Sequence, residues 1–428
     1  MTHGLYSLLL LLSSTTPPAP THLRTGHRAV GAVPLLDGVN TPRFSWRVHA
    51  ESIESKHVVQ TAYEVTVVEI LPSPSVVWSS GKIPSNASVL VPYGGESTPF
   101  HAHATFNWTV RIWTNEGGPS TMSPTSDAAT FTTGFVGNPR GDTELDHGWL
   151  ALPNDKSHQA RTMFTLPANK TAISARVYIA APGYAAVWIN GVELGQSHAL
   201  GPWTTWSKRV LYQSYEIAPS ALLMNQTAGN VIGVWLGNGQ FRSKWSHAAC
   251  KGGPPPITFS LTIHVSFDDG SSAFFGGTRQ AGTWRAAAGP ILSNDVYNGT
   301  HYDARAETPG WLTSHYDASS WKMLLPYGNT PCPLGPVSVD AFVPIQIVRR
   351  TAPLNVTRQA DGSFLFFFPE NLAGVVELNL ARGEVPSGTS LTMAHSEQLK
   401  DSSGNLCLVA CDGKGVEVFY PFATQSGS

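Results

Sequence analysis

The sequence predicts an all-β protein made of tandem β-sandwiches. Three observations support this fold class: short runs in which apolar and polar residues alternate, turn residues between those runs, and almost no amphipathic helix pattern. Alternation with a period of two places one face of a strand in the core and the other in water. Glycine and proline contribute 40 and 32 of the 428 residues, which favours many turns.

The charge composition excludes some classes of partner. Lysine and arginine number 27 against 29 aspartates and glutamates, and charged residues make up only 13% of the chain. Basic runs and stripes are absent, so we expect no nucleic-acid partner. No stretch reaches the roughly 18 consecutive apolar residues of a membrane span, so we expect no transmembrane segment.

Residues 1–24 are interpreted as a signal peptide and a linker. The apolar run from Leu5 to Leu12 is too short to span a bilayer and fits the hydrophobic region of a secretory signal. Asn-x-Ser/Thr sequons agree with a secretory route in a eukaryote and predict a glycoprotein. We therefore expect a secreted, extracellular protein. The sequons lie at Asn86, Asn107, Asn169, Asn225, Asn298 and Asn355.

The cysteines allow three disulfide pairings, and the sequence does not choose among them. They are Cys250, Cys332, Cys407 and Cys411. None belongs to a Cys-x-x-Cys pair, which disfavours a zinc ribbon or a thioredoxin-like site.

Residues 25–134 are predicted to form a fibronectin type III or immunoglobulin-like domain. The clearest alternating strands are Phe44–Val48, Tyr63–Val67 and Phe106–Trp113. About seven short strands in roughly 110 residues match the size of such a module. The expected core aromatics are Trp46, Trp78 and Trp108.

Residues 135–337 are predicted to form a jelly-roll-like sandwich. The strand Ala185–Ile189 leads directly into Asn190 and Gly191, a pair that strongly favours a hairpin turn. Further strands are expected at Ala175–Ala180, Val231–Leu236 and Ile257–Phe267.

Residues 338–428 are predicted to form a partial, truncated concanavalin-like sandwich. The chain ends soon after the last expected strand, so the domain is expected to be unfinished, with an open edge and exposed apolar side chains. The expected strands are Phe364–Phe368, Val375–Leu380, Ser390–His395 and Val416–Tyr420.

The order of short motifs along the chain resembles the N-terminal β-domains of bacterial α-L-rhamnosidases. In the first domain the motifs are Pro42–Trp46, Gln60–Tyr63, Trp78–Lys82 and Trp108–Trp113. In the second they are Gly183-Tyr184, Ile189–Gly191, Gly201–Thr204, Lys208–Tyr212, Ile232–Val234, Leu236–Gly239, Tyr302–Arg305 and Gly310-Trp311. In the third they are Asn371–Gly374 and His395–Glu397. Each motif is short, and their shared order makes the match specific.

The resemblance implies an inverting glycosidase that releases terminal α-L-rhamnose from rhamnose-containing glycosides or polysaccharides. Inverting hydrolysis needs two carboxyl groups about 6.5–9.5 Å apart, one as acid and one as base. In that family a helical (α/α) barrel following the β-domains carries this chemistry, with a catalytic-acid segment of the form Arg-Asp-Glu-Arg. This sequence has no such segment, so no catalytic residue is assigned and enzymatic activity is left undecided.

Two interpretations stay open. One is an α-L-rhamnosidase-type polypeptide that lacks the helical catalytic barrel, and the unfinished third domain favours it. The other is a non-catalytic carbohydrate-binding or adhesive protein made only of β-modules. Turnover of an aryl α-L-rhamnoside, or binding of L-rhamnose without turnover, would discriminate between them.

The candidate sugar-binding residues lie in the second domain. Sugar binding needs a flat aromatic face, offered by Trp203 and Trp206, and convergent polar groups, offered by Asn190 and Asn238. Rhamnosidase relatives sometimes use this domain as a calcium-assisted rhamnose-binding module. Glu193 and Asn238 would then be the calcium ligands, and no cofactor is otherwise required. The alternative is that the tryptophans are core residues and the asparagines merely occupy turns.

Overall fold

The computed structural model describes most of the chain between residues 16 and 395. The described residues are 16–26, 35–38, 41–50, 57–95, 100–115, 121–136, 143–146, 148–154, 158–195, 203–224, 229–243, 254–279, 281–296, 298–328, 332–340, 342, 345, 347–370, 372–379, 386 and 388–395. The chain divides into two compact units, with the main boundary between residues 141 and 142. No α-helix occurs among the described residues, and the all-β fold class is confirmed.

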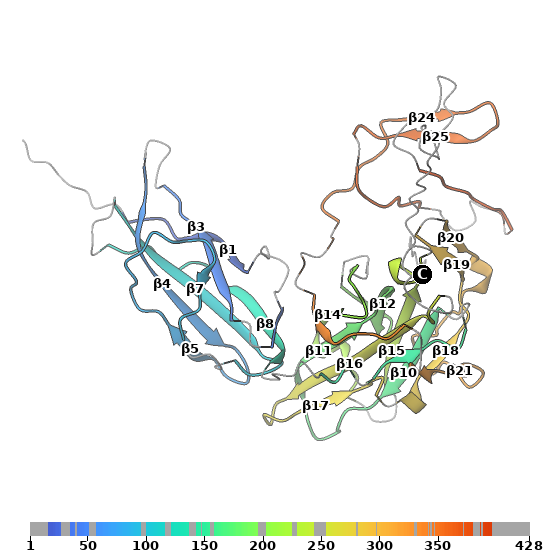
Figure 1. Ribbon diagram of the computed structural model, residues 1–428, viewed down its shortest axis with the longest axis horizontal. Helices are drawn as coiled ribbons and strands as arrows, with labels where there is room; N and C mark the ends of the chain where they lie inside the picture. Colours follow the sequence, from blue (N-terminus) through green and yellow to red (C-terminus); the bar gives the residue numbers. More distant parts are fainter. Residues whose placement is uncertain are drawn as a thin grey trace, which may run out of the picture. The chain divides into compact units, whose positions relative to one another are not determined.

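The first unit is a sandwich of two sheets (Figure 1). The strand order is β2-β8-β7-β4-β5 in the larger sheet and β1-β3-β6 in the smaller. All pairs are antiparallel except β2 with β8. The strands are β1 (Thr21–Thr25), β2 (Leu35–Gly38), β3 (Arg43–Arg47), β4 (Gln60–Glu69), β5 (Ser75–Ser79), β6 (Val91–Pro92), β7 (Thr105–Thr114) and β8 (Ala129–Val136).

Aromatic side chains from both sheets fill the core of the first unit. Trp108 on β7 is fully buried, and its ring centroid lies 4.6 Å from that of Phe44 on β3. Trp108 Nε1 donates a hydrogen bond of 2.9 Å to Thr25 Oγ1, so the buried indole N–H is satisfied. Trp46 is also buried, as predicted. Trp78 is only partly buried and packs against this core beside Phe44.

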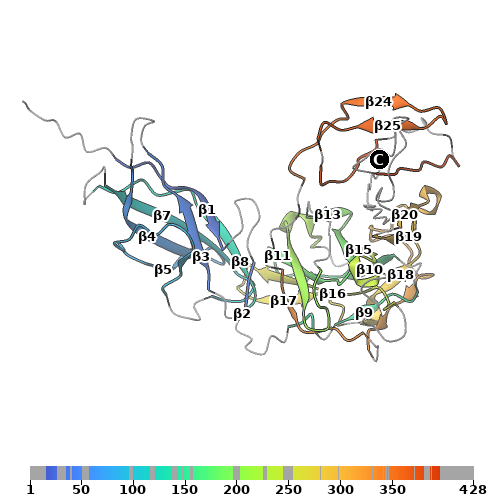
Figure 2. The ribbon, with the colours of Figure 1, turned by 45° about the horizontal axis from the view of Figure 1, so that its top comes forward.

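The second unit contains a larger sandwich (Figures 1 and 2). A six-stranded sheet has the order β13-β12-β15-β10-β18-β21, and a seven-stranded sheet has the order β22-β9-β16-β11-β14-β23, with β17 also paired to β16. The strands are β9 (Leu150–Ala151), β10 (Gln159–Phe164), β11 (Ala172–Ala180), β12 (Tyr184–Ile189), β13 (Val192–Leu194), β14 (Val210–Ile217), β15 (Asn230–Gly237), β16 (Thr258–Phe267), β17 (Ser272–Phe275), β18 (Arg285–Ala287), β21 (Lys322–Met323), β22 (Leu325–Pro326) and β23 (Val337–Val339).

Short elements complete this unit. A separate hairpin is formed by β19 (Ile291–Asp295) and β20 (Gly299–Tyr302). Single turns of 3-10 helix occur at η1 (Pro219–Ala221), η2 (Gln240–Arg242), η4 (Ala281–Thr283) and η5 (Ala304–Ala306).

The core between the two sheets of the second unit is mostly aliphatic. Val187 and Ile189 on β12 point into it, and Val177 and Ile179 on β11 face them from the other sheet. Trp284 is fully buried among them, and its ring meets Phe259 edge-on at 5.1 Å. The apolar residues that alternate along the sequence of β11 and β12 therefore face the core, as the period of a strand predicts.

A second apolar cluster, the tryptophan layer, covers the outer face of the six-stranded sheet. Its members are Trp188, Trp235, Trp311 and Trp321, with smaller apolar neighbours. Gly233 on β15 lies beneath it: a Cβ there would stand 2.1 Å from Leu312 Cδ2 and 2.8 Å from the Trp311 ring. The chain around Trp311 therefore rests directly on the backbone of the sheet.

Arg161 on β10 binds the segment around Trp311 and Tyr316 to the sheet. Arg161 is 3% exposed, and its guanidinium donates hydrogen bonds of 3.0 Å to the carbonyl oxygens of Thr313 and Tyr316. The same group lies 5.5 Å from the centroid of the Tyr316 ring. Burial lowers the pKa of Arg161, but a guanidinium starts so high that the group stays charged.

Residues beyond β23 contain fewer strands than the sequence predicts. A hairpin of β24 (Asn355–Arg358) and β25 (Phe364–Phe367) confirms the strand expected at 364–368. The strands expected at 375–380 and 390–395 are wrong where the chain is described, because 372–379 and 391–395 form none. A strand needs a neighbour for its backbone hydrogen bonds, and alternation alone does not supply one. The strand expected at 416–420 lies outside the described residues.

Several other expectations fall at or beyond the limits of the described chain. Cys332 is disulfide-bonded, but the other three cysteines lie outside the described residues, and the pairing stays open. The apolar run expected to be a signal peptide also lies outside them. No helix within the described ranges is long and apolar enough to cross a membrane.

We expect the Gly233→Ala substitution to destabilise the second unit by about 1–3 kcal/mol, because the new methyl group would displace Leu312 and Trp311 from the sheet. Urea denaturation followed by tryptophan fluorescence measures this loss. Gly282→Ala is the matched control, since a Cβ at Gly282 would meet nothing within 4 Å. Equal unfolding free energies of the two variants would contradict the close approach of Leu312 and Trp311 to Gly233.

We expect stability to fall between pH 6.5 and pH 4 because of His264. Burial lowers the pKa of this imidazole to about 4. The unfolded chain therefore takes up the proton first, and the folded state loses up to about 3 kcal/mol across this window. His264→Gln should flatten that part of the pH dependence of the unfolding free energy. His301→Gln, at an exposed histidine, serves as the control substitution.

Candidate functional site

Asn190, a predicted sugar ligand, is a structural residue of the β12–β13 hairpin. Asn190 and Gly191 both have positive φ, 49° and 86°, as the favoured two-residue hairpin turn requires. The Asn190 Nδ2 group donates to the Ala221 carbonyl at 2.8 Å and to Asn230 Oδ1 at 2.9 Å. Its Oδ1 accepts from the Val231 N–H at 2.8 Å. Both ends of the amide are engaged within the protein.

Asn238, the other predicted polar ligand, follows the end of β15. Its backbone N–H donates to Asn294 Oδ1 at 2.7 Å, and its Nδ2 donates to the Asn294 carbonyl. Its Oδ1 accepts from Arg242 Nη1 at 2.8 Å. The side chain joins β15, η2 and the β19–β20 hairpin, and binding a sugar or an ion would require it to exchange one of these bonds.

Glu193 and Asn238 lie too far apart to share a calcium ion. Glu193 is opposite Trp188 on β12, and Trp188 is opposite Gly233 on β15. Asn238 is five residues beyond Gly233, so the two side chains are roughly 17 Å apart along the strand direction. No cluster of three or more His, Cys, Asp or Glu side chains suited to a metal occurs within the described ranges.

Trp203 and Trp206 have different surroundings. Trp203 is 61% exposed, so its ring is available to a ligand. Trp206 is half-buried, and its ring meets Phe241 of η2 edge-on at 5.2 Å. The Trp206 Nε1 group is buried without a hydrogen-bond partner in the described structure. The structure therefore brings Trp206 close to the Asn238 end of β15 and leaves Asn190 and Glu193 at the other end.

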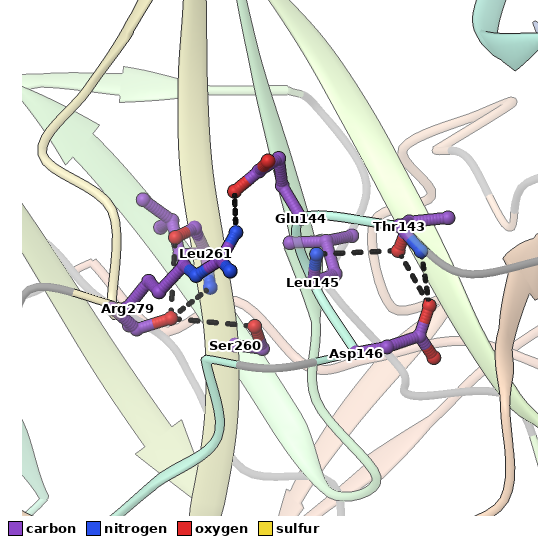
Figure 3. Close-up of polar contacts among 8 residues, drawn as sticks. Thr143, Glu144, Leu145, Asp146, Ser260, Leu261 and Arg279 are labelled. Carbon is purple, nitrogen blue, oxygen red and sulfur yellow. Dashed lines mark hydrogen bonds and ion pairs between the residues drawn. The ribbon is translucent and has the colours of Figure 1, made fainter.

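The structure also contains a small pocket that the sequence did not indicate. Its volume is about 100 Å³, and it is lined by Glu144, Leu261, Thr262, Phe274, Gly277 and Arg279. Arg279 Nη1 contacts Glu144 Oε2 at 2.9 Å, as Figure 3 shows. Sites for drug-sized ligands usually measure about 300–1,000 Å³, so this pocket suits water or a small group and not a sugar ring. Its two charged residues are 135 positions apart, and only the fold brings them together.

Hydrogen bonds beside this pocket fix the start of the second unit (Figure 3). Asp146 Oδ2 accepts from the backbone N–H of Thr143 at 2.6 Å and from its hydroxyl at 2.9 Å. Asp146 Oδ1 accepts from the Val337 N–H at 2.7 Å, which ties this segment to β23. These contacts give Asp146 a structural role.

Hydrogen bonding keeps several carboxyl groups ionised. Bonds from Ser271, Arg305 and Ser363 hold the pKa values of Asp269, Asp303 and Asp361 below the usual range. Such groups cannot donate a proton near neutral pH.

Glu193 differs from these carboxylates. Partial burial raises its pKa, and its carboxylate has no hydrogen-bond or ion-pair partner among the described residues. It is an exposed residue of β13, the edge strand of the six-stranded sheet, opposite Trp188 on β12.

Two sequence families match consecutive parts of the chain. Residues 20–137 match a family described as the Rha78A-like N-terminal immunoglobulin domain. Residues 170–349 match the α-L-rhamnosidase N-terminal domain. Their order agrees with the sandwich order of the structure.

Similar proteins and structures cover most of the chain. An α-L-rhamnosidase of Formosa agariphila is 27% identical over 387 residues, which are 82% of this chain and 38% of that protein. One of an Alteromonas species is 25% identical over 396 residues, 89% of this chain and 40% of that protein. The chain thus spans about two fifths of the length of these relatives.

Solved structures show the same arrangement of sheets. The α-L-rhamnosidase of Dictyoglomus thermophilum gives a TM-score of 0.66 at 25% identity, over 83% of this chain and 39% of that one. The Streptomyces avermitilis enzyme, solved with L-rhamnose, gives 0.70 at 20% identity, over 94% of this chain and 54% of that one. This chain therefore carries the N-terminal immunoglobulin-like and β-sandwich domains of the α-L-rhamnosidase family.

Proposed function

We propose that this polypeptide serves the release of terminal α-L-rhamnose from glycosides or polysaccharides by inverting hydrolysis. The observation that carries the proposal is the pair of α-L-rhamnosidase N-terminal domains, matched one after the other over 20–137 and 170–349. Relatives described as α-L-rhamnosidases align across both domains, which supports the same activity.

We assign the β-domains a non-catalytic part in this activity. Inverting hydrolysis needs a carboxylic acid of raised pKa and a second carboxylate about 6.5–9.5 Å away. Glu193 has a raised pKa, but it is an exposed residue on β13, the edge strand of its sheet, whereas acid catalysis needs an enclosed carboxyl group. The residues that carry the chemistry are therefore sought outside the described part of the chain.

A role in holding the substrate fits the second unit better. Trp203 presents an open aromatic face, and sugar rings stack their C–H groups on such faces. Trp206 Nε1 is a nearby buried donor without a described partner. These two tryptophans are the proposed sugar contacts. They also support the second candidate function, a carbohydrate-binding module that acts without hydrolysis.

Secretion to the extracellular space is part of the proposal. The apolar N-terminal run and the sequons support it, and so does a disulfide at Cys332, because disulfides persist in oxidising compartments.

We expect the purified 428-residue chain to bind L-rhamnose without hydrolysing an aryl α-L-rhamnoside. Calorimetry should show rhamnose binding that weakens roughly tenfold, about 1.4 kcal/mol, in Trp203→Ala, because the stacking face is lost. Tyr302→Ala is the control, at an exposed aromatic on a different hairpin, β20.

Each negative result has its own meaning. Saturable release of the aryl group by the chain would contradict the non-catalytic role but support the family activity. Equal rhamnose affinity of Trp203→Ala and the unmodified chain would contradict the sugar contact.

A further inference from the structure

We infer that Asn86, Asn169 and Asn355 are N-glycosylation sites and that Asn107 and Asn298 are not. The inference rests on the proposed secretory route and goes beyond the proposed function. All five carry the same Asn-x-Ser/Thr signal, so the sequence does not separate them. The structure separates them by the exposure of the asparagine and by the partners of its amide.

The modification joins a glycan to the side-chain amide. Asn Nδ2 attacks the anomeric carbon of an oligosaccharide carried on a lipid pyrophosphate, which is the co-reactant. The C–N bond forms as the bond from that carbon to the pyrophosphate oxygen breaks. The lipid pyrophosphate leaves, and Nδ2 loses one proton to the transferring enzyme. A glycan is bulky and strongly hydrated, so the folded protein accommodates it only at the surface.

Asn86 is held outward by a buried glutamine. Gln60 is 3% exposed, and its Nε2 donates to the carbonyl oxygens of Ser85 at 3.0 Å and Ala87 at 2.9 Å. Trp46 Nε1 donates to the Gln60 Oε1 at 2.8 Å and fixes this amide in place. Because the carbonyls on both sides of Asn86 are anchored to the protein, the exposed Asn86 side chain between them is left to the solvent.

Asn169 lies in an exposed turn before β11. The next residue, Lys170, is turned toward the protein, where its Nζ contacts Asp269 at 2.9 Å and Ser271 Oγ at 2.6 Å. The sequon threonine, Thr171, is exposed and its backbone N–H is held by Asp268 Oδ1 at 3.1 Å. The turn is therefore rigid, while the acceptor amide and the hydroxyl residue both face water.

Asn355 opens β24, and both it and Thr357 are exposed. The only described hydrogen bond of its amide is a long contact of 3.4 Å with the Thr357 hydroxyl of the same sequon. No other part of the described protein competes for this amide.

Asn107 occupies the middle of a sheet. It lies on β7 between Val68 on β4 and Thr130 on β8, and it is half-buried. Its Oδ1 accepts a hydrogen bond of 2.8 Å from the Thr130 hydroxyl. A glycan here would have to leave the sheet between two close cross-strand neighbours, whose side chains stand about 5 Å away.

Asn298 is exposed, but its sequon is engaged in the β19–β20 turn. Its Nδ2 and its backbone N–H donate to Asp295 Oδ1 at 3.0 and 2.9 Å. The sequon hydroxyl, Thr300 Oγ1, is buried. In the folded protein, the Asn298 amide is therefore occupied by Asp295, and the Thr300 hydroxyl is not accessible to a transferring enzyme.

The test is to express the full chain behind a supplied secretory leader in a eukaryotic host. Peptide N-glycosidase digestion in heavy-oxygen water converts each glycosylated asparagine into labelled aspartate, which peptide mass spectrometry locates. We expect the label at Asn86, Asn169 and Asn355 and none at Asn107 and Asn298. Asn86→Gln should remove one glycan from the intact mass, and the matched Asn107→Gln should remove none.

Two results would overturn the inference: label at Asn107 or Asn298 as abundant as at Asn86, or absence of label at any of the three assigned sites. The supplied leader keeps this test independent of residues 1–24. A parallel expression with the chain's own N-terminus tests secretion, and the rhamnose experiments test the proposed function. Failure of one proposal is thus distinguishable from failure of another.

Discussion

The second unit depends on burying both faces of its six-stranded sheet. The inner face packs on the aliphatic core around Trp284, and the outer face is covered by the tryptophan layer. Gly233 makes the second contact possible, because any side chain there would occupy the space of Leu312. A sheet that is apolar on both sides needs such a cover, and here one segment of the same chain provides it.

Arg161 fixes the position of the segment that covers the outer face of the sheet. A buried cation without a carboxylate partner is costly to desolvate, and none of the described carboxylates pairs with it. Carbonyl oxygens of Thr313 and Tyr316 and the face of the Tyr316 ring compensate instead. Those carbonyls belong to irregular chain that would otherwise have unsatisfied backbone groups, so the arginine and the segment stabilise each other.

The same construction limits what the second unit can do chemically. Asn190 and Asn238 hold turns together, several carboxylates are kept ionised by hydrogen bonds, and the pocket beside Arg279 is small. The ring of Trp203 is exposed and can meet a ligand. The proposed sugar contact therefore rests on this exposed face, because sugar rings stack their C–H groups on aromatic rings.

The sequence by itself determined the local features and the family. Alternation predicted the long strands β3, β4, β7, β11, β12, β15 and β16. Asn190 with Gly191 predicted the hairpin, and the order of short motifs identified the α-L-rhamnosidase N-terminal region. These signals are local, and each strand shows which residues face inward. Only the tertiary structure decided which strands pair and that Glu193 and Asn238 lie far apart. It also decided that Glu144 contacts Arg279 and which of the described sequons are exposed to water. Such relations join residues distant in the chain, and the period of a strand does not say which other strand lies beside it.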